Sequence, residues 1–565
     1  MTAAHHPSHP SAHPRPVDLQ SARQTKSRGA SAMTLSADLR IGDPVAAPHW
    51  DAIVIGAGLG GLSTAAFLAR EGQRVLVLEQ HEVVGGSSQS FRRGDDEFDV
   101  GLHRVGECEP GGRTRTLLAA LGVDQHVEWL PVGPDASTIT LPDLTVRVPV
   151  GWDAYEQRLA ETFPAEADGV RRCVTVLRDV AADLRVPRPG GAWAKLTGPR
   201  STRKWAGRSL TDLFDSCGLG ASARAVVAAE GGSYAAPPSA TPVSVHAGFL
   251  DHFLTSGAWY PRGGGQVLPE RLAQAVRDHG GEVHTGVQVD RVMVEHGRAI
   301  GVTLVDGEEL RADAVVSNAD PRRTWLALVG REHLPKRLLQ QAEAMEPALP
   351  FFTLHLVLDL DLRGTWDGST RWVHPETDVE GVYAELRAGR LPRRVPVMMT
   401  SRTLKDPEGA RPGRSVLELV SPAPREHHAW GLRAGGPAAG ERYSTNPDYL
   451  AAKQHMVDAV LATAETVIPG LRDHVLHCEA STPVTHERHT LASGGSALGL
   501  AVTGGQVGDR RPDVTSPVRG LFLTGSGTRH LPGVVNTLRG GAATAGAVLG
   551  RDLLAEIAQG SVARK

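Results

Sequence analysis

Residues 51–79 read DAIVIGAGLGGLSTAAFLAREGQRVLVLE, and this stretch decides the fold. Ala52–Ile55 is a short apolar run typical of a buried strand, and Arg74–Leu78 is a second one. Between them, a glycine-rich turn leads into a segment whose apolar residues recur at helical spacing from Leu62 to Ala69. The stretch therefore predicts a compact strand–helix–strand unit, which implies parallel strands joined by a right-handed crossover.

The glycine turn predicts a dinucleotide site. It supplies the spacing G-x-G-x-x-G at Gly56, Gly58 and Gly61. The first glycine permits a tight turn, the second lets the backbone approach a pyrophosphate, and the third lets the helix pack closely on the strand. The helix N-terminus offers unpaired N–H groups and a positive dipole end to phosphates. Glu79 ends the second strand about twenty residues further on, where a carboxylate accepts hydrogen bonds from a ribose.

Length and composition bound the remaining possibilities. The chain has 565 residues, which predicts two or three structural units, and its formal net charge of -3 lacks the basic excess of a nucleic-acid binder. The four cysteines are scattered without a C-x-x-C pair, which argues against a disulfide framework or a metal site and favours a reducing cytoplasm. No apolar run is long enough to span a bilayer, and no signal-peptide core is present.

The pattern along the chain predicts an α/β fold, α+β overall, with a discontinuous Rossmann-like domain. Residues 1–48 are rich in His, Pro, Ala and Ser and predict a disordered extension. Helical segments fill most of 151–256, residues 349–362 alternate like a half-buried strand, and residues 449–467 predict a long helix. We expect the dinucleotide domain to comprise 49–150, 257–330 and 480–565. An inserted substrate domain of helices and an antiparallel sheet would comprise 151–256 and 331–479.

Further motifs carry a family resemblance. The motifs are Gly85-Gly86-Ser87-Ser88, Glu97 to His103, Tyr260 to Gly265, Ala312 to Pro321, and Gly520 to Thr528 with Pro532-Gly533-Val534. Together they resemble the flavoprotein superfamily that includes phytoene desaturases, carotenoid cis-trans isomerases, retinol saturases and amine oxidases. The likeness runs from Asp51 to about Leu549 and so covers nearly the whole expected folded chain.

The resemblance implies FAD as the cofactor. In the superfamily, the Gly-Gly turn passes near the FAD pyrophosphate, and the C-terminal glycine motif forms a second binding segment. The implied cofactor-binding residues in this chain are Gly56, Gly58, Leu59, Gly60, Gly61, Glu79, Gln80, Gly85, Gly86, Ser87, Gly525, Ser526, Gly533, Val534 and Val535.

The sequence departs from the desaturase pattern in places that bear on the reaction. Ser87 stands where many members carry Arg, and the Gly-Gly-Ser-Ser stretch is similar to that of carotenoid isomerases. Gly101-Leu102-His103 is closer to retinol saturases. The loop from Arg529 to Val535 lacks the extra glycines of carotenoid desaturases. These differences leave desaturation, isomerisation and saturation open.

Two histidines lie in motifs that are expected to approach the flavin. His103 and His530 are the candidate catalytic residues, because a histidine near pKa 6.5 exchanges protons at neutral pH. The alternative is that each only hydrogen-bonds a loop or the cofactor. Arg539 either faces a cofactor phosphate or caps a helix. His486 to His489 lack zincin spacing and predict a structural strand, and we expect no metal.

The expected function is an FAD-dependent oxidoreductase that acts on C–C or C=C bonds of a long apolar polyene or isoprenoid. One alternative is an oxidase or dehydrogenase of an amine or a natural-product intermediate. Another is a non-enzymatic prenyl carrier like the Rab GDP-dissociation inhibitors. The resemblance implies an apolar small-molecule substrate and no nucleic acid. It also implies a cytoplasmic location with peripheral contact at the inner face of a membrane, and it leaves the electron acceptor unassigned.

Overall fold

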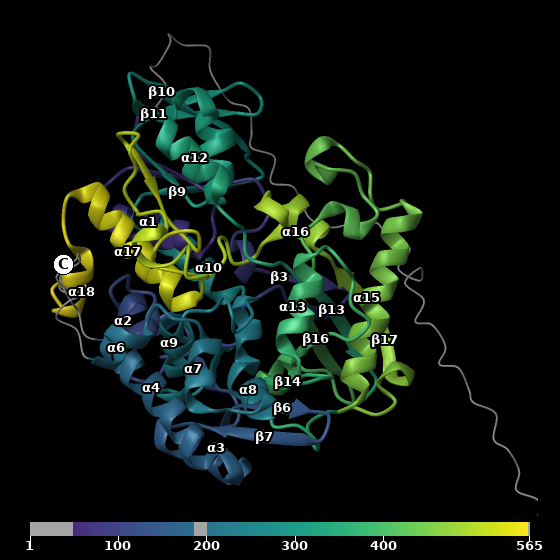
Figure 1. Cartoon of the computed structure of the whole chain (residues 1–565). Coiled ribbons are helices and arrows are strands. Elements are labelled where there is room, and N and C mark those ends of the chain that lie inside the picture. Colours follow the sequence, from purple (N-terminus) through teal and green to yellow (C-terminus); the bar gives the residue numbers. More distant parts are fainter. Residues whose placement is uncertain (1–48, 186–199, 563–565) are drawn as a thin grey trace, which may run out of the picture. The chain divides into compact units, whose positions relative to one another are not determined.

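A seven-stranded sheet carries the glycine turn at one of its edges (Figure 1). The computed structural model describes residues 49–185 and 200–562. The strand order is β10-β11-β12-β1-β2-β9, and β18 also pairs with β12. The strands of this sheet are β1 (Trp50–Ile55), β2 (Val75–Glu79), β9 (Glu282–Thr285), β10 (Val289–Glu295), β11 (Arg298–Leu304), β12 (Glu309–Ser317) and β18 (Leu521–Leu523).

The centre of this sheet is parallel, as the sequence predicts. β1 pairs in parallel with β2 and β12, so that Ile53 lies opposite Leu76 on one side and Val315 on the other. β12 in turn pairs in parallel with β18. Because the carboxyl ends of parallel strands meet at one edge, the segments that follow β1, β2, β12 and β18 converge there, which is where such sheets bind ligands.

Both faces of the parallel strands are covered, which explains their continuous apolar runs. Ala52 and Val54 of β1 belong to the core beneath the helices α1 (Leu59–Arg70), α10 (Val267–Asp278) and α17 (Val534–Leu549). Ile53 and Ile55 point to the opposite face, where they join a second core with Trp325. The π-helix 324–330 and β10 supply much of that second core.

The helices α1 and α17 approach each other closely through small residues. The hydroxyl of Ser63 donates to the carbonyl of Leu538 at 3.1 Å. A Cβ atom added at Gly541 would lie 2.5 Å from Cβ of Ser63 and 2.9 Å from the backbone nitrogen of Thr64. The glycine is therefore required for the distance between these two helices.

A second seven-stranded sheet lies apart from the glycine turn, and most of its pairings are antiparallel. Strand β13, the second from one edge, is buried along nearly its whole length, so the expectation of a half-buried strand was wrong: packed elements cover both of its faces. In spatial order the strands are β17 (Val475–Ser481), β13 (Phe351–Leu358), β16 (Ser415–Pro422), β15 (Val397–Thr400), β14 (Arg371–Val373), β6 (Asp135–Leu141) and β7 (Leu144–Pro149).

Helices fill the described part of the expected insert 151–256. They are α3 (Trp152–Thr162), α4 (Ala167–Arg185), α6 (Arg200–Trp205), α7 (Leu210–Cys217), α8 (Ala221–Ala228) and α9 (Val243–Leu254). The other helices are α2 (Arg113–Ala119), α11 (Pro321–Arg323), α12 (Lys336–Ala344), α13 (Val379–Arg387), α14 (Arg402–Lys405), α15 (Pro447–Glu465), α16 (Pro483–Thr490) and α18 (Leu553–Ala558). Two small antiparallel sheets pair β3 (Ser90–Arg93) with β4 (Asp96–Asp99) and β5 (Trp129–Pro131) with β8 (Trp259–Pro261).

The division of the chain into domains stays a prediction. Strands β6 and β7, within 135–149, pair with the second sheet, although the sequence placed them with the dinucleotide portion. The predicted disordered extension, residues 1–48, lies outside the described residues.

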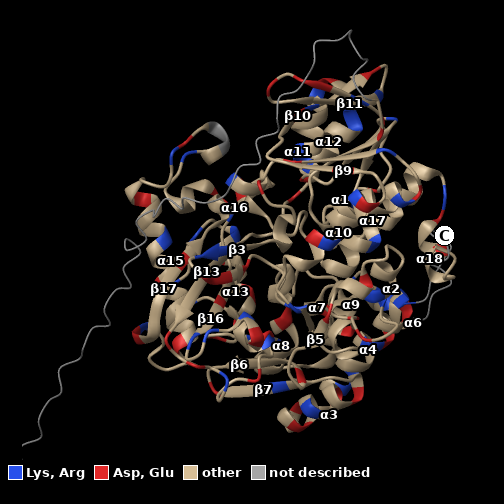
Figure 2. Ribbon diagram, turned by 180° about the vertical axis from the view of Figure 1, so that it is seen from behind, with Lys and Arg blue, Asp and Glu red and all other residues tan. Residues whose placement is uncertain are grey.

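The surface shows mixed charge. Figure 2 shows basic and acidic positions interspersed along the outer helices and loops. Across residues 49–185 and 200–562, none of the helices has the length and apolar character needed to cross a membrane.

The close contact between α1 and α17 predicts that a methyl group added at position 541 destabilises the protein. Gly541→Ala should lower the thermal midpoint, since a clash of this kind costs about 1–3 kcal/mol. That loss exceeds the gain of about 1 kcal/mol in intrinsic helix propensity. Gly504→Ala is the matched control, because a Cβ there meets nothing within 4 Å. Thermal unfolding of both variants at equal FAD saturation measures the effect, and an unchanged or raised midpoint for Gly541→Ala would contradict the predicted clash.

Candidate functional site

The glycines of the turn between β1 and α1 have two different structural roles. Some allow close backbone packing, and one leaves room for a ligand. Gly56 has φ +94°, which favours glycine. A Cβ at Gly61 would lie 2.2 Å from the carbonyl of Gly56, and one at Gly60 would lie 2.7 Å from Cα of Gly525. At Gly58, by contrast, the close contact would be the side-chain amide of Asn318 at 2.8 Å. Backbone packing therefore demands glycine at 60 and 61, whereas a Cβ at position 58 would meet only the end of the Asn318 side chain.

Asn318 connects the strand ends at this edge, and the sequence analysis did not select it. It follows β12, and its N–H donates to the carbonyl of Ile55 at 2.9 Å. Its side chain lies against Gly56, Gly58 and Gly525. The signal that could have found it is a polar residue directly after a buried parallel strand, within the family-like stretch from Ala312 to Pro321.

Glu79 is buried at the carboxyl end of β2 and helps to shape the turn. Its carboxylate accepts hydrogen bonds from the N–H groups of Ala57 at 2.7 Å and His81 at 2.8 Å. Gln80 follows and donates through its side-chain nitrogen to the carbonyl of His489 at 2.9 Å. The acid thus lies where the fingerprint expects it, and it lines a cavity.

A cavity of about 310 Å³ occupies this edge of the sheet, and we call it the cradle. Thirteen of the expected cofactor residues line it, namely Gly56, Gly58, Leu59, Gly60, Glu79, Gln80, Gly85, Gly86, Ser87, Gly525, Ser526, Gly533 and Val534. Gly61 is absent from the lining and serves helix packing. Val535 lines a second, larger cavity instead. The structure thus brings together segments that are far apart in sequence.

These residues fit the expected FAD. The N-cap residue of α1, Gly58, makes no side-chain capping bond, and the first turn of α1 carries no acidic residue. The helix therefore presents its N–H groups and positive dipole end to an anion. The N-cap of α17, Gly533, is likewise free of a side-chain capping bond and lines both cavities. Which of these residues contact the cofactor stays a prediction.

The larger cavity measures about 1140 Å³ and adjoins the cradle, with which it shares residues such as Gly86 and Gly533. We call it the main cavity. Its walls come from the helical insert, the second sheet and the start of α17. Aromatic side chains recur around it, namely Phe91, Tyr234, Phe249, Phe253, Phe351, Trp372 and Tyr383.

His103 lines the main cavity. Its Nδ1 is buried without a hydrogen-bond partner among the described residues. Burial, reinforced by the positive charge of Lys405, lowers the pKa of His103 to about 3. The ring is therefore neutral at physiological pH. Its catalytic role stays a prediction that this electrostatic setting does not favour.

His530 lines neither the cradle nor the main cavity, and its catalytic role stays a prediction. Its side chain lies against Gly540 of α17. Leu531 adopts φ +70° and lines the main cavity in its place. The left-handed conformation of Leu531 changes the direction of the loop, and the sequence pattern alone does not indicate this conformation.

The structure contradicts the predicted strand at His486 to His489 and places Arg539, whose role stays a prediction. His486 to His489 belong to helix α16, so the predicted strand was wrong. Thr482 caps this helix by accepting from the N–H of Thr485, and Pro483 occupies its first turn, which are helix-start signals. Arg539 lines the main cavity and does not line the cradle.

A hydroxyl–imidazole pair lies in the wall of the main cavity. The hydroxyl of Tyr234 and Nδ1 of His246 are 2.7 Å apart, and both side chains are buried. Burial raises the pKa of Tyr234 well above its usual value and lowers that of His246 to about 4. Both groups are therefore neutral at pH 7, and the tautomer of His246 decides which of the two donates in this bond. The pair was not singled out from sequence, because both residues lie in a helical segment without a motif.

A buried charge cluster holds the segment that contains His103. The ammonium of Lys405 donates to the carbonyl of His103 at 2.9 Å and to the hydroxyl of Thr400 at 2.8 Å. Asp99 accepts from the hydroxyl of Tyr260 and from the N–H of Gly265. Burial alone would raise the pKa of Asp99, but Lys405 and a nearby arginine, Arg402, outweigh it and hold the pKa below its usual value. These buried contacts thus hold in place the segment that contains His103 and lines the main cavity.

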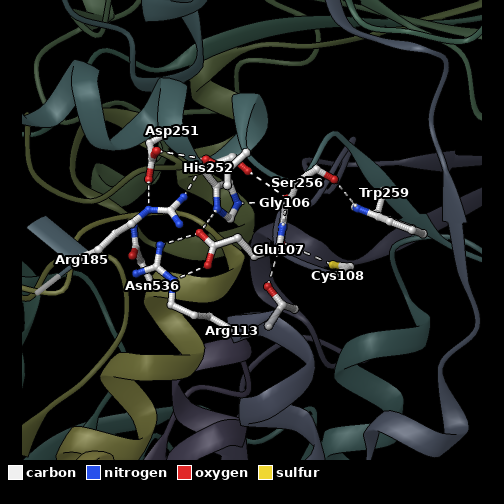
Figure 3. A network of polar contacts seen from close by, with 12 residues as sticks. Gly106, Glu107, Cys108, Arg113, Arg185, Asp251, His252, Ser256, Trp259 and Asn536 are labelled. Carbon is white, nitrogen blue, oxygen red and sulfur yellow. Dashed lines mark hydrogen bonds and ion pairs between the residues drawn. The ribbon is translucent and has the colours of Figure 1, made fainter. Parts of the chain in front are cut away.

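A second polar network forms one corner of the main cavity (Figure 3). Glu107 is buried, has φ +59°, and accepts from Nδ1 of His252 at 2.7 Å and from the guanidinium of Arg113. Although burial opposes its ionisation, these hydrogen bonds lower the pKa of Glu107 to about 2. The N–H of Gly106 donates to Nε2 of His252 at 3.1 Å. Both ring nitrogens of His252 are therefore engaged, and it positions this corner.

The close contacts in the cradle predict that the Gly58→Val protein still folds but binds FAD more weakly. The branched side chain would occupy the space that a pyrophosphate needs, so FAD affinity should fall by at least about tenfold. Gly60→Ala is the contrasting variant, because its Cβ meets backbone and should destabilise the fold. Flavin released per chain and circular dichroism measure the two effects. A folded Gly58→Val protein with normal FAD content would show that the cofactor lies elsewhere.

Buried histidines predict a loss of stability in acid. Burial lowers the pKa of His355 to about 3 and that of His374 and His486 to about 4. The unfolded chain binds these protons near pH 6.5 and the folded chain does not, so stability falls as pH drops from about 6.5 to 4. The thermal midpoint should be lower at pH 5 than at pH 7.5, and His355→Gln should reduce the difference. Equal midpoints in wild type would contradict this.

Comparisons with known proteins agree with this site. The family described as flavin containing amine oxidoreductase matches residues 59–432. All-trans-retinol 13,14-reductase of Danio rerio is 27% identical over 538 residues, which cover 89% of this chain and 86% of that protein. Prolycopene isomerase 1, chloroplastic, of an Oncidium hybrid cultivar is 26% identical over 510 residues, which cover 86% of this chain and 82% of that protein.

A solved structure of an oxidoreductase from Methanosarcina mazei has the same fold, with a TM-score of 0.61 at 18% identity over 88% of this chain and 100% of that chain. The family match, which spans more than half of the chain, confirms the flavoprotein resemblance and FAD as the cofactor. The chain is an FAD-dependent oxidoreductase and belongs to the flavin-containing amine oxidoreductase family.

Proposed function

We propose that this flavoenzyme acts on C–C or C=C bonds of a long apolar polyene or isoprenoid, by desaturation, isomerisation or saturation. The observation that carries the proposal is the main cavity, which adjoins the cradle and measures about 1140 Å³. Most small-molecule sites fall between about 300 and 1,000 Å³, so this space suits a long ligand beside a cofactor ring.

The walls of the main cavity suit a flat conjugated chain. Phe249 packs edge-on against Tyr234 and Phe253, with ring centroids 5.7 and 5.3 Å apart. Trp372 and Met398 of the second sheet also line the cavity. Such side chains offer apolar and aromatic surface to a polyene and exclude water from it.

The similar proteins support the same substrate class. One is named a reductase of all-trans-retinol and another an isomerase of prolycopene, and both of these compounds are polyenes. The two names describe different outcomes on conjugated double bonds. We therefore keep reduction, isomerisation and desaturation as the three forms of the proposal.

The residues of the chain divide the work as follows. FAD supplies the redox chemistry when bound. Tyr234 holds a neutral hydroxyl in the cavity wall, fixed by His246, which makes it a candidate to hold a proton close to substrate. The ring of His103 is neutral at pH 7, because its pKa is about 3, so it does not act there as an imidazolium acid. Its backbone carbonyl, fixed by Lys405, positions the segment Gly101 to Arg104 along the cavity.

An amine substrate fits this cavity less well. A protonated amine would meet Arg539, a cation in the lining with no carboxylate partner among the described residues. A prenyl carrier without a cofactor is also disfavoured, because the cradle keeps its glycines, Glu79 and an uncapped helix N-terminus.

Access from a membrane is part of the proposal, since a polyene is nearly insoluble in water. Leu184 lies near the end of α4, is 51% exposed and lines the main cavity. An exposed apolar side chain at a cavity opening suits transient contact with a lipid surface. We therefore propose that the helical insert 151–256 forms the entrance, with peripheral contact at the cytoplasmic face of a membrane.

Anaerobic turnover tests the function. The protein is incubated with liposomes that contain all-trans-retinol or a poly-cis carotenoid, in one series with oxidised FAD and in another with FAD reduced beforehand by dithionite. Product mass and flavin absorbance are followed. We expect a product that gains two hydrogens, loses two hydrogens or changes only its retention time, and we expect the protein to float with the liposomes. Turnover of small polar amines alone, without flotation, would overturn the proposal.

A further inference from the structure

The arginines that line the main cavity follow a pattern with one exception. Five of the six form an ion pair with a carboxylate, namely Arg92 with Glu97, Arg93 with Glu479, Arg104 with Glu230, Arg113 with Glu107, and Arg185 with Asp251. Within residues 49–185 and 200–562, Arg539 is the one lining arginine without such a partner. Its positive charge is thus left uncompensated at the cavity surface.

Arg539 reaches the main cavity because of the way α17 turns. Val535, Asn536 and Arg539 line the main cavity, whereas Thr537 lines the cradle. Asn536 and Arg539 are three residues apart and therefore neighbours on one helix face. Arg539 consequently faces the space proposed for the substrate and points away from the cradle that would hold the cofactor phosphates.

The surroundings of Arg539 add positive charge. The pKa of its guanidinium is lowered first by partial burial and then by the charge of Arg113. Arg113 comes from α2, which packs against α17, and Figure 3 shows Arg113, Arg185 and Asn536 at the same corner. Glu107 and Asp251 are committed to Arg113 and Arg185, and both are buried. Neither carboxylate is available to neutralise Arg539.

We propose that Arg539 binds a carboxylate at the end of an otherwise apolar substrate. Arg539 is exposed to the space of the main cavity and has no carboxylate partner among the described residues, so an anionic ligand group would supply its counter-charge. A guanidinium binds a carboxylate through two parallel hydrogen bonds, which fixes the ligand's direction as well as its end. This inference rests on the proposed function and narrows it from polyenes in general to acidic ones.

The pair all-trans-retinoate and all-trans-retinol tests the inference, since the two share a carbon skeleton and differ in the terminal group. Binding to the FAD-loaded protein is followed by quenching of tryptophan fluorescence. We expect retinoate to bind about tenfold or more tightly than retinol, as a charge-assisted hydrogen bond allows. In Arg539→Gln the ratio of the two dissociation constants should fall to about one, with retinol affinity little changed. Arg539→Lys should restore part of the preference.

The matched control is Arg529→Gln, ten residues earlier, since Arg529 pairs with Asp513 and lines neither cavity. It should keep the preference for retinoate. The FAD content and flavin absorbance of each variant are measured in parallel. Loss of FAD in Arg539→Gln would make Arg539 a cofactor contact and overturn the inference.

The remaining outcomes separate the inference from the proposed function. Equal affinity for retinoate and retinol in wild type, or an unchanged ratio in Arg539→Gln, overturns the inference and leaves the polyene proposal standing. If wild type binds neither retinoid while it turns over a carotenoid hydrocarbon, the carboxylate inference alone fails. If it binds and converts no polyene at all, both fail.

Discussion

The close approach of backbone to backbone at the carboxyl edge of the parallel sheet is the constraint on which the rest of this structure depends. Gly60 admits the loop after β18, Gly61 admits the carbonyl of Gly56, and Asn318 lies among them. This approach brings together segments more than 450 residues apart in sequence and creates the cradle between them. Gly541 likewise allows α17 to pack closely against α1, because a side chain there would clash with that helix. Where side chains are absent, the chain can form a precise space for a ligand.

Buried charged groups stabilise the walls of the main cavity. The main cavity is largely apolar, yet buried charged groups hold the segment along its wall: Lys405 donates to the carbonyl of His103, and Glu107 accepts from His252 and Arg113. Such pairs contribute little net stability but lose much when broken, so they hold loops in one geometry. The segment from Gly101 to Glu107 therefore keeps its position without belonging to a helix or strand.

Sequence reasoning reached the parallel sheet and most of the cradle, because both depend on local patterns. A strand, a glycine turn, a helix and an acid lie within residues 51–79, and the distant Gly525 and Gly533 are recognisable by motif. The reasoning failed where tertiary contacts decide. His530 is excluded from the cavities by the left-handed turn at Leu531, and Tyr234 gains its importance only through His246, on a different helix. Thr482 and Pro483 were a local helix-start signal that was overlooked.

Helix α17 serves both cavities at once, since one side of its first turns lines the cradle and the other lines the main cavity. The two sites thus share a rigid body. Binding free energies are reciprocal, so if occupation of one cavity shifts this helix and changes affinity in the other, the same factor must act in the opposite direction. Cofactor loading and substrate affinity are then linked quantities, and a dissociation constant for either ligand has meaning only at a stated saturation of the other.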